Sequence, residues 1–183
     1  MATVNTESIT TAQQLLELPG DFGPCELVRG ELIMMNAAGS RHGRAKGEIF
    51  GILHAFLREN KLGVIFPSDN GFLLEQDTVR CPDVAFVCAA RMPTEPIDGF
   101  FPGPPDLAVE IRSPSTRLPE VLAKISQYLE TGVKVIWDVD PEAQTVTIYR
   151  AAGTVATYSG DATLTEPELL PGFSIALKEI FVW

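Results

Sequence analysis

The sequence predicts a mixed α/β fold, in which one mixed β-sheet is flanked by helices and β-hairpins lie near both ends of the chain. Two observations predict it. First, segments with helical periodicity alternate with short apolar segments typical of strands. Second, the chain has 183 residues, which suffices for a full hydrophobic core. We therefore expect residues 1–183 to form a single domain.

The N-terminal half begins with a predicted hairpin over residues 25–35, because apolar and polar residues alternate weakly around a central Arg29-Gly30. A helix is predicted over 41–60, where apolar residues recur at three- and four-residue steps. We expect Ser40 to cap this helix and Leu62-Gly63 to end it. Three strands are then expected, at 64–66, 72–75 and 79–88.

The C-terminal half continues with an apolar strand at 106–112 and a second helix at 118–131, where Pro119 suits the first turn. The remaining expected elements are a strand at 133–139, a hairpin made of 145–150 and 154–158, and a turn at 170–173.

Charge and cysteine content limit the classes of function. The net charge of -10 disfavours tight, non-specific binding to nucleic acid, although Arg41, Arg44 and Lys46 form a local basic cluster beside His42. The three cysteines have no Cys-x-x-Cys spacing, which argues against a disulfide framework or a zinc site. We expect three reduced thiols.

The sequence also indicates a cytoplasmic protein. Residues 1–11 are polar and lack the basic start and apolar run of a signal peptide. No apolar segment approaches the roughly 20 residues of a membrane span. We therefore expect no association with the membrane.

Two acidic residues are placed on otherwise apolar strands. On the strand 106–112, alternation puts Glu110 and Arg112 on one face, and Asp83 begins another apolar strand. Burying such charges is costly unless they meet solvent, a partner or a metal ion. Two carboxylates on neighbouring strands can hold a hard divalent cation that activates water for phosphodiester hydrolysis. The alternative is a salt bridge from Glu110 to Arg112 or Lys124.

Several motifs together resemble one known family. Pro82-Asp83 followed by Glu110-Ile-Arg112 is similar to the pattern Pro-Asp…(Asp/Glu)-x-Lys of restriction-endonuclease-like nucleases. The match is closer to the bacterial family of putative restriction endonucleases, and it extends over almost the whole chain. The residues that carry it are Glu26-Leu-Val-Arg-Gly-Glu-Leu-Ile33, His42, Cys81-Pro-Asp-Val-Ala-Phe86, Pro104-Pro-Asp-Leu-Ala-Val-Glu-Ile-Arg-Ser-Pro-Ser115, Lys124, Tyr128, Gly132-Val133, Trp137-Asp-Val-Asp-Pro141 and Leu170-Pro-Gly-Phe173.

This resemblance implies a restriction-endonuclease-like core and a set of metal ligands. Asp83, Glu110 and the backbone carbonyl of Ile111 would hold Mg²⁺ or Mn²⁺. Arg112 stands where the superfamily usually has its lysine, and arginine is a poor base. Arg112 would therefore steady phosphate charge, while Lys124 of the following helix would orient or help to activate the attacking water.

Structural alternatives stay open for Lys124, and several other residues are assigned accessory or structural roles. Lys124 shares a helical face with Val121 and Tyr128, so it could also be a lysine whose stem lies on apolar surface, or it could pair with Glu120 at i, i+4. His42 and Glu48 on the first helix are accessory candidates, with a structural histidine and a solvated glutamate as the alternatives. Glu26 and Glu31 flank the hairpin turn and are expected to be surface charges. Ser113 and Ser115 are expected to shape a turn.

The sequence therefore predicts a Mg²⁺-dependent endodeoxyribonuclease that hydrolyses phosphodiester bonds in nucleic acid, with DNA as the partner. The alternative is a catalytically inactive nuclease-fold protein that acts as a nucleic-acid-binding or assembly module. A homodimer is also expected, because nucleases that cut both strands are often two-fold dimers. The apolar residues 180–183 could contribute to its interface.

Overall fold

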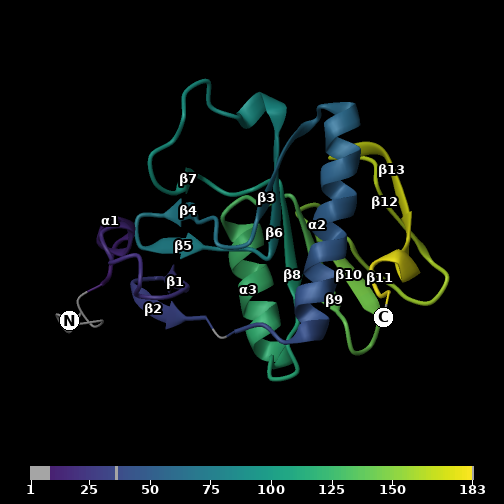
Figure 1. Cartoon of the computed structure of the whole chain (residues 1–183), viewed down its shortest axis with the longest axis horizontal. Coiled ribbons are helices and arrows are strands. Elements are labelled where there is room, and N and C mark those ends of the chain that lie inside the picture. Colours follow the sequence, from purple (N-terminus) through teal and green to yellow (C-terminus); the bar gives the residue numbers. More distant parts are fainter. Residues whose placement is uncertain (1–8, 36, 183) are drawn as a thin grey trace.

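A six-stranded mixed sheet forms the centre of the molecule in the computed structural model, which describes residues 9–35 and 37–182 (Figure 1). Its strand order is β11-β10-β9-β8-β6-β3. β8 and β9 are parallel, and the other neighbours are antiparallel. The strands are β3 (Gly63–Pro67), β6 (Val84–Cys88), β8 (Leu107–Ile111), β9 (Val135–Asp140), β10 (Thr145–Arg150) and β11 (Val155–Tyr158).

Two helices cover opposite faces of this sheet, as the alternation along β8 requires. Leu107, Val109 and Ile111 share a core with α2 (Ser40–Asn60), whereas Ala108 packs with α3 (Leu118–Glu130). Figure 1 shows α2 and α3 with the strands between them. The prediction of a mixed sheet flanked by helices is therefore confirmed.

A second sheet lies beside the first and has the strand order β2-β1-β5-β4-β7. β1 (Cys25–Val28) and β2 (Glu31–Met34) form the predicted N-terminal hairpin, and both turn residues, Arg29 and Gly30, have positive φ. The short helix α1 (Ala12–Leu16), which sequence reasoning missed, packs on this sheet. The other strands are β4 (Phe72–Glu75), β5 (Thr78–Arg80) and β7 (Phe101–Pro102).

The expected single strand 79–88 is wrong, and the structure contains further sheets beside the mixed sheet that was predicted. The segment divides into β5, which belongs to the second sheet, and β6, which belongs to the first. The break falls at residues 81–83, where Pro82 has no backbone N–H to donate to a neighbouring strand. The chain thus crosses between the sheets immediately before Asp83.

The C-terminal region contains more strands than predicted. β10 and β11 form the expected hairpin, but residues 170–173 are not a turn. They begin β13 (Leu170–Ala176), which pairs with β12 (Thr163–Glu166) and leads to a 3-10 turn, η3 (Leu177–Glu179). Leu170 and Phe173 are buried there, and the ring centroid of Phe173 lies 5.3 Å from that of Phe56 on α2.

The predicted helix ends are also corrected. Gly39, not Ser40, is the N-cap of α2, and Ser40 is its first helical residue. At the other end Lys61 adopts the left-handed conformation. Gly63 instead begins β3, where a Cβ would lie 2.1 Å from the carbonyl oxygen of Val87. A second 3-10 turn, η2 (Ala89–Arg91), follows β6.

The structure bears on the expected dimer interface at residues 180–183 and on the expected absence of a membrane span. Ile180 and Phe181, expected at a dimer interface, are buried in the protein's own core, and Trp183 lies outside the described residues. The polar segment 1–8 also lies outside them. Among the helices that are described, none combines the length and hydropathy needed to cross a bilayer.

Candidate functional site

A cleft of about 580 Å³ opens between the two sheets, where the chain crosses from β5 to β6. Its walls come from the N-terminal hairpin, the start of α2, the end of β8 with the loop that follows it, and α3. The polar side chains on these walls are Glu26, His42, Lys46, Ser68, Asp69, Asp83, Glu110, Ser113, Ser115 and Lys124. The cleft thus collects most of the residues that the sequence singled out.

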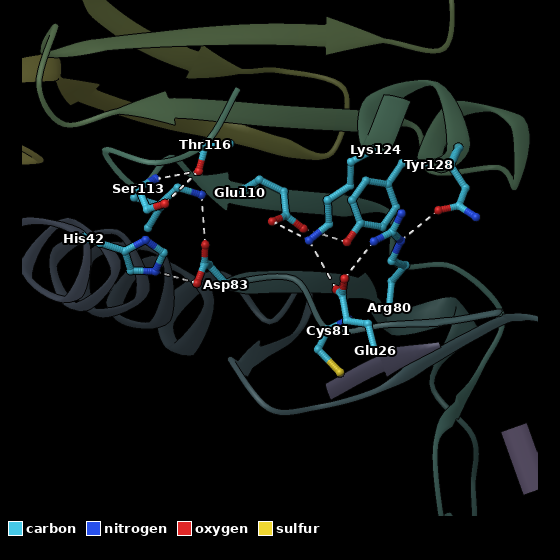
Figure 2. A network of polar contacts seen from close by, with 12 residues as sticks. Glu26, His42, Arg80, Cys81, Asp83, Glu110, Ser113, Thr116, Lys124 and Tyr128 are labelled. Atoms are coloured by element: carbon cyan, nitrogen blue, oxygen red, sulfur yellow. Dashed lines mark hydrogen bonds and ion pairs between the residues drawn. The ribbon is translucent and has the colours of Figure 1, made fainter. Parts of the chain in front are cut away.

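Asp83 lies where the chain passes from β5 to β6, and both of its carboxylate oxygens are in contact with other residues. The antiparallel pair Val84–Val109 places Asp83 across from Glu110. Its Oδ2 accepts a hydrogen bond from the backbone N–H of Ile111 at 2.9 Å, and its Oδ1 lies 2.8 Å from Nε2 of His42. These contacts fix the carboxylate where the ends of β8 and α2 approach each other (Figure 2).

His42 is the first-turn residue of α2 that reaches Asp83. Its side chain is only 13% exposed, and its Nδ1 is buried without a hydrogen-bond partner among the described residues. One ring nitrogen of a neutral histidine donates and the other accepts. If Nε2 donates to Asp83, Nδ1 is an acceptor for which the described part of the chain supplies no donor.

Glu110 points toward α3, as the alternation along β8 predicted. Its Oε1 accepts a hydrogen bond from the hydroxyl of Tyr128 at 2.6 Å, and its Oε2 accepts one from Nζ of Lys124 at 2.9 Å. Burial raises the pKa of Glu110 to about 7, and the negative charges of Asp83 and Glu26 act in the same direction against the opposing charge of Lys124. Burial therefore disfavours the ionised form of Glu110, and a cation bound beside this carboxylate would favour that form.

Lys124 bridges two carboxylates. Besides its bond to Glu110, its Nζ lies 3.2 Å from Oε1 of Glu26. Burial lowers the pKa of Lys124, but the charges of Glu110 and Glu26 outweigh burial and hold that pKa above its usual value. Lys124 is thus an ammonium ion at neutral pH, able to donate hydrogen bonds to water or phosphate. The pairing with Glu110 is also the salt bridge that the sequence left open as an alternative.

Glu26 corrects a prediction, because it is buried and not a surface charge. It is 4% exposed, its Oε2 accepts from Nη1 of Arg80 at 2.7 Å, and its Oε1 accepts from the backbone N–H of Cys81 at 2.9 Å. Glu31 is exposed as expected. Sequence reasoning missed its burial, because the two cations that it contacts, Arg80 and Lys124, lie 54 and 98 residues away in the chain.

Arg112 is not paired with Glu110. Its guanidinium forms a fork with the carboxylate of Asp138 and also lies 3.5 Å from Asp140, both on β9. It lines a neighbouring cavity of about 440 Å³ that shares His42 and Ser113 with the main cleft. Arg112 is therefore beside the candidate site, with its charge already balanced by two carboxylates.

The remaining predicted residues differ in position. Ile111 lines the cleft and gives its N–H to Asp83, whereas Glu48 is not among the residues that line it. Ser113 shapes the turn after β8, since its N–H and hydroxyl both bond to Thr116. Lys46 was noted only as part of a basic cluster, yet it lines the cleft and its Nζ lies 3.9 Å from Asp83.

The three cysteines are free thiols, as predicted. Cys81 is buried, and burial together with the nearby charge of Glu26 raises its pKa to about 12. A thiol with that pKa is protonated at neutral pH and is neither a nucleophile nor a ready metal ligand.

The donor set limits which metal could bind. Within residues 9–35 and 37–182, no group of three or more His, Cys, Asp or Glu side chains is arranged to hold a metal ion. Asp83 and Glu110 are a pair of hard oxygen donors in one cleft. Mg²⁺ is commonly held by one or two carboxylates, with water and substrate phosphate completing its coordination. The pair therefore fits Mg²⁺ or Mn²⁺ and does not fit a zinc site.

Comparisons with known proteins agree with this fold. A family model described as putative restriction endonuclease matches residues 12–178 of the chain. Among solved structures, the chain is similar to the crystal structure of a putative nuclease from Anabaena variabilis, with a TM-score of 0.81 and 24% sequence identity over 93% of this chain and 97% of that one. That likeness confirms the predicted nuclease-like fold. None of the curated proteins matches.

Proposed function

This chain belongs to the family of putative restriction endonucleases, and on that premise we propose that it is a Mg²⁺- or Mn²⁺-dependent endonuclease that cleaves DNA in the cleft between its two sheets. The observation that carries the proposal is the convergence of Asp83 and Glu110. They come from the facing ends of β6 and β8 and line one cleft with Lys124.

The chain's own residues supply the parts that phosphodiester hydrolysis requires. Asp83 and Glu110 would hold the cation, with the backbone carbonyl of Ile111 as a further ligand. A bound divalent cation polarises the phosphate and lowers the pKa of coordinated water. Lys124, as an ammonium ion, would orient the attacking water and offset the negative charge that develops on phosphate.

The basic wall of the cleft would contact the substrate. Lys46 lines the cleft, donates to Ser68 at 3.1 Å and lies 3.9 Å from Asp83, so it would contact a phosphate bound beside that carboxylate. His42 borders the same space, and Arg112 would steady phosphate charge from the adjoining cavity. Lys46 and Lys124 thus place positive charge in the cleft of a chain whose net charge of -10 otherwise opposes binding to DNA.

The test is metal-dependent nicking of supercoiled plasmid by the wild type, Asp83→Ala and Glu110→Ala. We expect each substitution to lower the rate at least about a hundredfold, the usual scale for losing a group that stabilises developing charge. Glu95→Gln changes an exposed carboxylate outside the cleft and should keep wild-type activity. Equal nicking by all four preparations would mean that a contaminant cuts the plasmid.

A second candidate is a catalytically inactive nuclease-fold protein that binds nucleic acid or assembles with other proteins. The existing contacts of the two carboxylates favour it, because both oxygens of Asp83 and of Glu110 already have polar partners within the protein. Calorimetric titration with Mg²⁺ and Mn²⁺ separates the candidates. Absence of heat, combined with unchanged nucleic-acid binding by Glu110→Ala, would favour the inactive protein.

The homodimer, the cytoplasmic location and the single domain over 1–183 stay predictions. Burial of Ile180 and Phe181 in the monomer core removes one proposed source of the dimer interface. Sedimentation at concentrations spanning the micromolar range measures the oligomeric state directly, and a single species of 19.9 kDa would contradict the dimer.

A further inference from the structure

The buried glutamate of the N-terminal hairpin is tied to the candidate site from three elements. Glu26 stands on β1, Arg80 on β5 donates to it, and Lys124 on α3 donates to it as well. Arg80 is in turn held by Gln127 of α3, whose Oε1 accepts from Nε at 2.7 Å. Figure 2 shows the chain of contacts running from Glu110 through Lys124 and Glu26 to Arg80.

Burying the carboxylate of Glu26 costs free energy that its surroundings must offset. A glutamate that is 4% exposed loses most of its hydration, and only close opposite charges and hydrogen bonds compensate for that loss. Glu26 has both, with Arg80 on one oxygen and Lys124 and a backbone N–H on the other. The guanidinium of Arg80 fixes the carboxylate, so the oxygen that faces Lys124 has a defined position.

Lys124 shares its ammonium between two carboxylates that both line the cleft, and the side chain of Glu26 is 5% exposed whereas that of Glu110 is 19% exposed. Glu110 is one of the two carboxylates proposed to ligate the cation, and it lines the cleft together with Lys124. A carboxylate that ligates a divalent cation has less charge to offer an ammonium ion. The position of Lys124 would then depend on Glu26, which lies 3.2 Å from Nζ and is anchored from behind.

We propose that Glu26 is a positioning residue that holds the ammonium of Lys124 in the cleft when Glu110 ligates the cation. Arg80 and Gln127 keep the Glu26 carboxylate in place from the side away from the cleft. The inference rests on the proposed nuclease function and deepens it, since it assigns to the hairpin a part in placing the group that orients water and phosphate.

The decisive experiment is a double-variant comparison of plasmid cleavage with Glu26→Gln, Lys124→Ala and the two combined. Glu26→Gln keeps the side-chain shape and an oxygen acceptor but removes the charge. We expect it to lower kcat by about tenfold to a hundredfold, the scale of a displaced catalytic group, with KM for plasmid changed less than kcat. In the Lys124→Ala background it should have no further effect on kcat. Glu31→Gln, an exposed acid of the same hairpin, is the matched control.

Losses in kcat that add in the double variant would overturn the proposal, because they would mean that Glu26 acts independently of Lys124. Unchanged kcat in Glu26→Gln would overturn it too. If Glu26→Gln does not fold, Glu26→Asp replaces it in the same comparison, since it retains the charge for Arg80 and withdraws the oxygen from Lys124 by one methylene.

A readout that needs no catalysis separates failure of this inference from failure of the proposed function. Acylation of Lys124 by acetic anhydride is followed by mass spectrometry with and without Mn²⁺, and the exposed Lys178 serves as the internal reference. We expect Lys124 to stay protected in the wild type with Mn²⁺ and to react severalfold faster in Glu26→Gln with Mn²⁺. Equal protection in both proteins, at a Mn²⁺ concentration where calorimetry shows the ion bound, would overturn the inference, whether or not plasmid is cut.

Discussion

Removing the hydroxyl of Tyr128 tests how much its hydrogen bond to Glu110 contributes to the free energy of unfolding. Tyr128 is fully buried on α3, where its ring packs among apolar side chains of the helix and the sheet. Its hydroxyl donates to Glu110 at 2.6 Å. Tyr128→Phe keeps the ring and removes only this donor, so any loss of stability comes from the hydrogen bond and the acceptor that it leaves unpaired.

The size of the loss follows from the charge on Glu110. A hydrogen bond to a charged group contributes about 1.5–3 kcal/mol, so at pH 8, where the carboxyl group is ionised, we expect the free energy of unfolding to fall by about 2 kcal/mol. For a chain of this length that corresponds to a decrease in Tm of about 4–8 °C. The pKa of Glu110 is raised to about 7. At pH 5.5 the bond joins two neutral groups and the loss should shrink to about 1 kcal/mol.

Urea titrations at the two pH values, without divalent cations, measure both losses. Tyr158→Phe is the control, because it also removes a hydroxyl and no hydrogen bond to that hydroxyl is described. If Tyr128→Phe behaves like Tyr158→Phe, or if the loss at pH 5.5 equals or exceeds the loss at pH 8, the hydroxyl of Tyr128 does not stabilise an ionised Glu110.

Three further predictions concern pH, backbone space and thiol reactivity. Burial raises the pKa of Glu110 from 4.5 to about 7, so the folded protein binds a proton that the unfolded chain releases over this window. The stability of the wild type relative to Glu110→Gln should therefore fall as pH rises from 4.5 through 7 in urea titrations, and a constant difference would contradict this. Gly63→Ala should lower the free energy of unfolding by about 1–3 kcal/mol or more, because its Cβ would lie 2.1 Å from a backbone oxygen. Gly51→Ala on the exposed face of α2 should raise it by about 0.5–1 kcal/mol, and similar effects at the two sites would be inconsistent with the packing. Cys81, with a pKa of about 12, should be the slowest of the three thiols to react with iodoacetamide at pH 8 in site-resolved mass spectrometry, and its labelling first would contradict its burial.

How much of the site could be predicted depended on whether its determinants were local. Alternation along 106–112 was sufficient to place Glu110 opposite the apolar stripe, and helical spacing placed Lys124 on the same face of α3 as Tyr128. Both patterns reflect backbone geometry and need no knowledge of distant partners. The structure brings these residues together with Asp83 in one cleft.

What sequence reasoning missed was determined by contacts between distant segments. In the sequence, Glu26 cannot be distinguished from an exposed charge near a hairpin turn. Its burial follows from the packing of the second sheet against α3. Its pairing with Lys124 and Arg80 depends on how two sheets pack, which no local pattern encodes. The division of 79–88 into two strands also follows from the packing of two sheets, because the chain passes from one sheet to the other at Pro82. The proline itself was a local signal against one continuous strand.

The central claim is that Asp83 and Glu110 together bind one divalent cation. Anomalous diffraction from crystals soaked in Mn²⁺ addresses it most directly. We predict a single strong peak in the cleft, coordinated by an oxygen from each carboxylate, that disappears in Asp83→Ala. A Mn²⁺ site elsewhere, or an empty cleft with Lys124 still bound to Glu110, would contradict the account.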